Sequence, residues 1–311
     1  MRRNFVRGSL VAVAAAFGAG SRTSEGSPIP RGLDIADGQG LTLRKAYVDA
    51  RFGQMHLRMV GQRQRATERG KRPLVCFHLS PVSSVIYETW LSEMGKDRWA
   101  IAIDTPGYGM SDPPPKPPSI GDFAAAMGDC LDALGIGETD VMGYHTGSKI
   151  AVELARQRSQ QIKHLVLVSA PVYTAEDLAQ VRVDNAVPTP EPSGEFLKQI
   201  WQALWRWQDK AVTPEALMHS FPDHLRGGDR RAWGHQAAFA YTYPPHIADI
   251  MAPILVLNPE DDLVTYTRRI APYLQNGRVH ELPGRSHGFL DLHPSEVAAI
   301  VRPFLDRNDG R

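Results

Sequence analysis

The sequence has little cysteine, little net charge and no apolar run long enough to cross a membrane. Its 311 residues include only two cysteines and carry a formal charge of +1. Beyond the N-terminus, the basic stretch at 69–72 is short, so the chain lacks the electrostatic footprint of a nucleic-acid-binding protein. With 42% hydrophobic residues the chain is too apolar to be disordered. We therefore expect a globular protein that acts on a small molecule and binds no nucleic acid.

The two cysteines are poorly placed for a disulfide or a redox motif. Cys76 lies in an apolar run typical of a strand and Cys130 on a helical pattern, and no CxxC spacing occurs. We favour buried free thiols over a disulfide.

The N-terminus has the features of an export signal. Arg2 and Arg3 precede the apolar run 8–20, which is shorter than the roughly 20 residues needed to span a bilayer. The pair also resembles the twin-arginine signal of bacteria, which a receptor reads and which is no anchor. We predict a signal peptide over 1–25, a linker over 26–42 and a periplasmic mature protein without a membrane anchor. The alternative is a frayed basic terminus on a cytoplasmic protein.

From about residue 43 the hydrophobic pattern alternates between short strand-like runs and helical stretches, which is typical of an α/β fold with a largely parallel sheet. We expect an opening antiparallel pair near Phe52-Gly53 and helices on both faces of the sheet. Strands are predicted within 46–50, 56–60, 74–77, 99–103, 140–142, 165–168, 254–257 and 278–282, and helices at about 120–134, 147–159 and 294–306. The core thus comprises 43–170 and 246–307. The interval 171–245 is too long for a simple loop and is predicted to be an inserted helical cap. Aromatic residues at helical spacing more often form the core of such a cap than line a pocket, and we expect this of Trp201, Trp205 and Trp207.

The strongest local signal is Gly143-Tyr144-His145-Thr146-Gly147, between an apolar strand and an amphipathic helix. Its glycines permit a sharp, strained corner, where side chains would collide with the neighbouring strand and helix. The corner puts His145 at a helix N-terminus, which disfavours a protonated imidazole. A lone histidine is usually structural, but at this corner we expect a functional one.

This segment resembles the nucleophile elbow of α/β-hydrolases, with histidine where that family usually has serine, aspartate or cysteine. Four further segments resemble family motifs in the same order: Phe77-His78-Leu79-Ser80-Pro81, Asp104-Thr105-Pro106-Gly107-Tyr108-Gly109, Asn258-Pro259-Glu260-Asp261-Asp262 and Gly284-Arg285-Ser286-His287. The first departs from the family pattern by Leu79 in place of glycine. Together they cover about residues 44–307.

The resemblance implies a carboxylic-ester or related hydrolase acting on a small, partly apolar ester or lactone. Its catalytic residues would be His145, Asp262, which the spacing favours over Asp261, and His287. The oxyanion hole would be formed by Leu79, Ser80 and Thr146, and the substrate contacts by His78, Tyr144 and Trp233. No cofactor is expected. A metal site of His145, His287 and Asp262 is conceivable, but family geometry puts the acid on the side of the histidine away from the elbow.

Several roles for His145 stay open at the level of sequence. It could attack an acyl carbon and form an acyl-imidazole, or it could act as a general base on water. Two other classes compete. One is a lyase or cofactor-free oxygenase in which His287 is the base, and the other is a non-catalytic binding protein that kept the pocket. His78 and Pro81 could also merely turn the chain.

Overall fold

The computed structural model describes residues 41–184 and 188–307. The predicted signal at 1–25 and nearly all of the predicted linker at 26–42 lie outside the described residues. Within the described ranges, no helix is long and apolar enough to cross a membrane.

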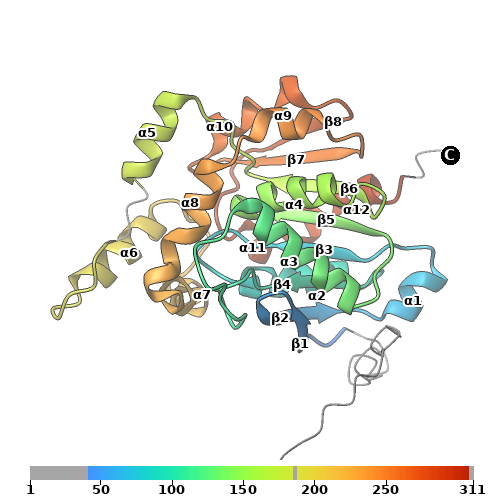
Figure 1. Cartoon of the computed structure of the whole chain (residues 1–311), viewed down its shortest axis with the longest axis horizontal. Coiled ribbons are helices and arrows are strands. Elements are labelled where there is room, and N and C mark those ends of the chain that lie inside the picture. Colours follow the sequence, from blue (N-terminus) through green and yellow to red (C-terminus); the bar gives the residue numbers. More distant parts are fainter. Residues whose placement is uncertain (1–40, 185–187, 308–311) are drawn as a thin grey trace, which may run out of the picture.

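One eight-stranded sheet forms the centre of the molecule (Figure 1). Its strands are β1 (Arg44–Ala50), β2 (Gly53–Val60), β3 (Leu74–Phe77), β4 (Ala100–Ile103), β5 (Thr139–Tyr144), β6 (Ile162–Val168), β7 (Ile254–Pro259) and β8 (Gly277–Leu282). They are ordered β1-β2-β4-β3-β5-β6-β7-β8. β2 pairs antiparallel with both β1 and β4, and all other pairs are parallel. The predicted α/β class and the antiparallel opening pair are confirmed.

Helices cover both faces of the sheet (Figure 1). One layer contains α3 (Ile120–Ala133), α4 (Thr146–Gln157) and α9 (Tyr243–Ala248), and the other contains α2 (Glu88–Met94), α11 (Phe289–Leu292) and α12 (Pro294–Leu305). The core also contains the short elements α1 (Arg63–Glu68), η1 (Ser84–Tyr87), α10 (Val264–Arg268) and η3 (Ala271–Tyr273). The three helices predicted within the core all form.

The strands read as continuous apolar runs because both of their faces are buried. In β3, Val75 and Phe77 pack into one layer while Leu74 and Cys76 pack into the other, as the alternation of side chains along a strand requires. Both cysteines are buried and free, which confirms that prediction.

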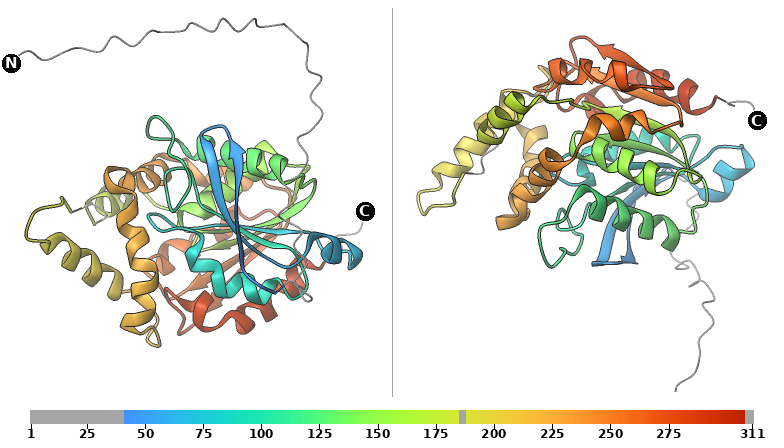
Figure 2. Two further views of the ribbon diagram at one scale, coloured as in Figure 1. Left: turned by 90° about the horizontal axis from the view of Figure 1, so that it is seen from below. Right: turned by 45° about the horizontal axis from the view of Figure 1, so that its top comes forward.

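The segment between β6 and β7 is helical. It contains α5 (Ala175–Asp184), α6 (Glu195–Trp205), α7 (Pro214–Arg226), η2 (Gly228–Ala232) and α8 (Trp233–Ala240), followed by α9. Helices α5 to α8 lie beyond one end of the sheet (Figures 1 and 2). Trp205 and Trp207 are 41% and 42% exposed, so these two do not form the cap core that the aromatic spacing predicts.

Candidate active site

His145 sits at the corner between β5 and α4, in a backbone conformation that side chains rarely adopt. Its φ is 49° and its ψ is −111°. The corner is fixed on both sides, because the N–H of His145 donates to the carbonyl of Val168 at 3.0 Å and its own carbonyl accepts from the Ser148 hydroxyl at 2.6 Å. Strain of this kind persists only where the surroundings impose it, and it concentrates at functional sites.

Both glycines of the corner are required because backbone atoms of neighbouring segments approach them closely. A methyl group on Gly143 would meet the carbonyl oxygen of Gly147. A methyl group on Gly147 would meet the carbonyl oxygens of Phe77 and His78 at the end of β3. The steric role predicted for both glycines is therefore present, and the start of α4 is held against the end of β3.

Asp261 follows β7 and faces His145. Its side chain is fully buried, and its Oδ2 lies 3.4 Å from Nε2 of His145. The same oxygen accepts a hydrogen bond of 2.5 Å from the Ser169 hydroxyl, while Oδ1 accepts one of 2.9 Å from the N–H of Leu263. Ser169 also has a positive φ, of 48°. Among the described residues, His145 and Ser169 are the two non-glycine residues with positive φ, and both lie against Asp261.

Asp262 and His287 form the second pair. Nε2 of His287 lies 2.9 Å from Oδ1 of Asp262, as expected for the acid and histidine of the family resemblance. Burial disfavours the charged imidazolium, but the hydrogen bond and negative charge of Asp262 outweigh it and raise the pKa of His287. Burial acts in the opposite sense on Asp262, yet its bond to His287 and the nearby imidazoles hold the pKa of that carboxyl well below its usual range.

Tyr144 lies beneath the two histidines and is itself only 3% exposed. Its ring stacks on that of His287 with centroids 5.9 Å apart and meets that of His145 edge-on at 4.9 Å. Its hydroxyl is 3.3 Å from Nδ1 of His287. Tyr144, predicted to contact the substrate, therefore packs against both imidazole rings and supports them.

The pair His145–Asp261 and the pair His287–Asp262 lie side by side and form one cluster. The ring centroids of His145 and His287 are 5.1 Å apart. One ligand atom from each of His145, Asp261, Asp262 and His287 lies within 4.8 Å of every other. All three residues predicted to be catalytic are brought together, and Asp261, to which the sequence spacing gave less weight, joins them.

The predicted oxyanion segment lies beside the elbow, because the start of α4 packs on Phe77 and His78. In the described part of the chain, no backbone carbonyl of a turn or loop accepts a hydrogen bond from the N–H of Leu79 or Thr146. Two N–H groups at a helix start and an adjacent loop are the usual components of an oxyanion hole.

His78 is 1% exposed and both its ring nitrogens are engaged within the protein. Nε2 accepts from the N–H of Thr105 at 2.9 Å, and Nδ1 lies 2.7 Å from the carbonyl of Leu79. Burial, the largest influence, lowers the pKa of the imidazole. The residue ties the end of β3 to the loop after β4, a structural role different from the chain turn considered for it from sequence.

His235 on α8 is a site residue that sequence reasoning missed. Burial, with a smaller contribution from His145, lowers its pKa to about 4. The backbone of Ser80 acts in the opposite sense and raises the pKa by a smaller amount. Close packing holds α8 there, since a methyl group on Gly234 would meet the side chain of Ser80. No motif marks this position, because the cap helix acquires its role only by docking.

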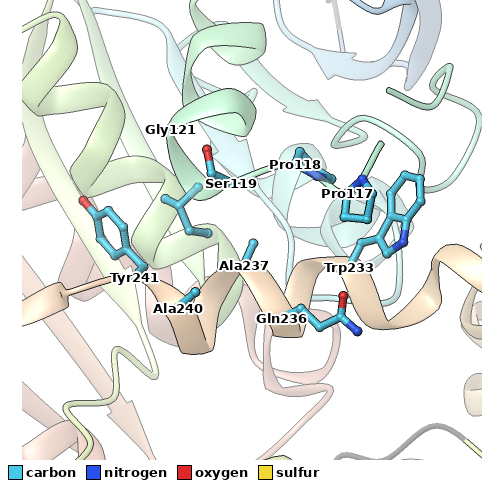
Figure 3. Close-up of a pocket in the computed structure, with 10 residues that line it drawn as sticks. Pro117, Pro118, Ser119, Gly121, Trp233, Gln236, Ala237, Ala240 and Tyr241 are labelled. Carbon is cyan, nitrogen blue, oxygen red and sulfur yellow. The ribbon is translucent and has the colours of Figure 1, made fainter. Parts of the chain in front are cut away.

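Trp233 lies on a different face of α8. It lines a cavity of about 340 Å³ together with Gln236, Ala237, Ala240 and Tyr241, opposite Pro117 to Gly121 at the start of α3 (Figure 3). Positions 233, 236, 237 and 240 share one helical face, whereas His235 and Phe239 stack on another. The structure therefore does not bring Trp233 together with His145.

A β5 corner with a catalytic candidate, an acid after β7 and a histidine after β8 define the class of protein. Residues 72–215 match the family described as alpha/beta hydrolase fold. The chain has the α/β-hydrolase fold, and its central residues match that family.

Named relatives are hydrolytic enzymes. The chain is 24% identical over 248 residues to the poly(3-hydroxyalkanoate) depolymerase of Ectopseudomonas oleovorans, which covers 77% of this chain and 86% of that protein. Two solved structures share the fold. The enol-lactonase from Burkholderia xenovorans LB400 has a TM-score of 0.68 at 18% identity over 84% of this chain and all of that one. Naproxen esterase from Bacillus subtilis also gives 0.68, at 18% identity over 85% and 92%. These similarities support an enzymatic hydrolase of this superfamily.

Proposed function

We propose that the protein hydrolyses a small, partly apolar carboxylic ester or lactone, with His145 as the group that attacks the acyl carbon. The observation that carries the proposal is the meeting of two His–Asp pairs at the elbow. His145 occupies the nucleophile position of the superfamily, and its side chain is 12% exposed. Imidazole is nucleophilic at neutral pH without prior deprotonation.

In the first step a lone pair on a ring nitrogen of His145 forms a bond to the acyl carbon. The carbonyl oxygen becomes an oxyanion, which accepts hydrogen bonds from the N–H groups of Leu79 and Thr146. Collapse breaks the bond to the leaving oxygen. The ring loses its proton and the leaving alcohol gains one, with His287 carrying the proton between them.

In the second step His287, oriented by Asp262, takes a proton from water. The hydroxide adds to the acyl-imidazole, and the acid departs as the ring of His145 recovers a proton. In a lactone the released alcohol and acid stay on one molecule, so the same two steps open the ring.

The aromatic surroundings support a partly apolar substrate. Tyr173 follows β6 and contacts Phe239 of the cap and Tyr266 of α10, with centroids 6.2 and 5.0 Å away. The nearby acids Asp261 and Asp262, after burial itself, help to raise the pKa of Tyr173, so this phenol stays neutral at pH 7. The proteins similar to this chain include a poly(3-hydroxyalkanoate) depolymerase, an enol-lactonase and an esterase, which supports an ester or lactone bond as the substrate bond.

The test is turnover of a panel of esters and lactones by the metal-free mature protein beside His145→Ala, His145→Ser and His287→Ala. We expect parent activity, loss in both alanine variants and an acyl adduct on His145 by mass spectrometry. His219→Gln serves as a control, because this histidine is on the cap surface with its side chain 66% exposed.

Other outcomes would reject the proposal in distinct ways. Full activity in His145→Ala with none in His287→Ala would make His287 the base and remove the covalent step. Ligand binding without turnover of any panel member would favour the non-catalytic binding protein.

A further inference from the structure

We infer that His145, His287, Asp261 and Asp262 form a binding site for one divalent transition-metal ion of the zinc class. Binding of the ion requires no hydrolytic activity, so the inference goes beyond the proposed function although it uses the same side chains.

The spacing of the ligand atoms fits such an ion. Zinc binds imidazole nitrogen and carboxylate oxygen at about 2.0–2.2 Å, so neighbouring ligands in a tetrahedral shell lie about 3.4 Å apart. Nε2 of His145 lies 3.4 Å from Oδ2 of Asp261, which is long for an N–H···O hydrogen bond and equal to that ligand spacing. All four ligand atoms lie within 4.8 Å of one another, so small side-chain rotations close the shell.

The charges of the cluster also favour a dication. The cluster contains the carboxylates of Asp261 and Asp262, and the side chain of Asp261 is fully buried. With both imidazoles neutral the cluster holds a charge of −2, and the half of it on the fully buried Asp261 is costly without a counter-charge. Two imidazolium rings with centroids 5.1 Å apart would repel each other. A dication neutralises the carboxylates and leaves both imidazoles neutral.

Neighbouring groups orient the ligands as they do in known metal sites. The Ser169 hydroxyl and the Leu263 N–H fix Asp261. The Tyr144 hydroxyl, 3.3 Å from Nδ1 of His287, can accept a hydrogen bond from an N–H at that nitrogen and leave Nε2 for the ion. The ion then replaces the proton between Nε2 and Asp262, so binding releases protons.

The sequence-based argument against a metal considered only Asp262, placed behind His287. The structure adds Asp261, which reaches His145 directly and completes a set of two histidines and two carboxylates. An ion held there fixes both imidazoles and both carboxylates, so neither His145 nor His287 can play its part in the proposed acyl transfer. Metal binding and metal-free hydrolysis are therefore mutually exclusive.

The experiment is calorimetric titration of Zn²⁺ into the chelator-treated mature protein, with Co²⁺ absorption as a report of the ligand geometry. We expect one ion per chain, a raised melting temperature on binding and at least tenfold weaker binding in Asp261→Asn and in His145→Ala. His219→Gln and Glu260→Gln, which change an exposed histidine and the exposed acid next to Asp261, should bind like the parent. Circular dichroism of each variant establishes that it is folded.

The inference is overturned if the folded parent shows no 1:1 binding, or if both Asp261→Asn and His145→Ala bind as tightly as the parent. These outcomes are separable from those of the proposed function. Zinc binding without turnover in any metal state rejects the hydrolase and keeps the metal site. Turnover by metal-free protein that binds no zinc supports the hydrolase and rejects the metal site.

Discussion

Nε2 of His145 lies 3.4 Å from Oδ2 of Asp261, across 116 positions of sequence. The carboxylate is fully buried and is held in place by Ser169. His145 therefore has an acidic partner of its own, separate from the Asp262 that pairs with His287. The site contains two His–Asp pairs where the family resemblance implies a single pair and a nucleophile.

Asp261→Asn should lower kcat/KM of metal-free protein by at least about tenfold, because the amide cannot replace the negative charge that faces the imidazole. Steady-state hydrolysis measures this effect. Glu260→Gln provides the matched control, since it removes an exposed carboxylate next to the same position. Equal rates in all three proteins would show that Asp261 has no part in the reaction.

Tyr144→Phe should reduce kcat severalfold and leave folding intact. The change keeps the ring that stacks on His287 but removes the hydroxyl near its Nδ1, so the imidazole is less well oriented. The measurement is kcat and KM together with a melting curve. An unchanged kcat would assign Tyr144 a packing role alone.

Gly147→Ala should destabilise the protein by about 1–3 kcal/mol or more, because overpacking against backbone cannot be relieved by rotating a side chain. Its methyl group would meet the carbonyl oxygen of Phe77. Gly137→Ala is the control, since nothing lies within 4 Å of the methyl group it adds. Urea unfolding of both variants compares them directly, and equal stability would contradict the close approach of α4 to β3.

Lys149→Met should raise stability, and more so at low pH. Lys149 is 3% exposed, and burial lowers its pKa to about 7. Its Nζ contacts the carbonyl of Pro171 at 3.2 Å and the ring of Tyr243 at 3.9 Å. Between about pH 7 and 10 the unfolded chain binds the proton more tightly than the folded chain, so this lysine makes stability rise with pH by at most about 1.4 kcal/mol per unit.

The gain from Lys149→Met should thus be full below pH 7 and shrink toward pH 10. Urea unfolding across this range, with the exposed Lys210→Met as reference, measures it. A gain that does not change with pH would mean that the folded and unfolded chains bind the Lys149 proton equally tightly, and that burial does not lower its pKa.

The sequence alone determined the layers of this protein and the position of its unusual corner. Continuous apolar strands, amphipathic helices and glycines at Gly143 and Gly147 are local consequences of burial and backbone sterics, so their periodicity and turn chemistry can be read along the chain. His145, Asp262 and His287 were found because each follows a strand in a recognisable order.

Tertiary structure decided which of two adjacent acids faces His145, and that Ser169 supports it. It also placed His235 beside the oxyanion segment and turned Trp233 toward a separate cavity. These outcomes depend on the direction of side chains at strand ends and on how the cap docks. Neither leaves a periodic trace in the sequence, because contacts between distant segments are set by packing.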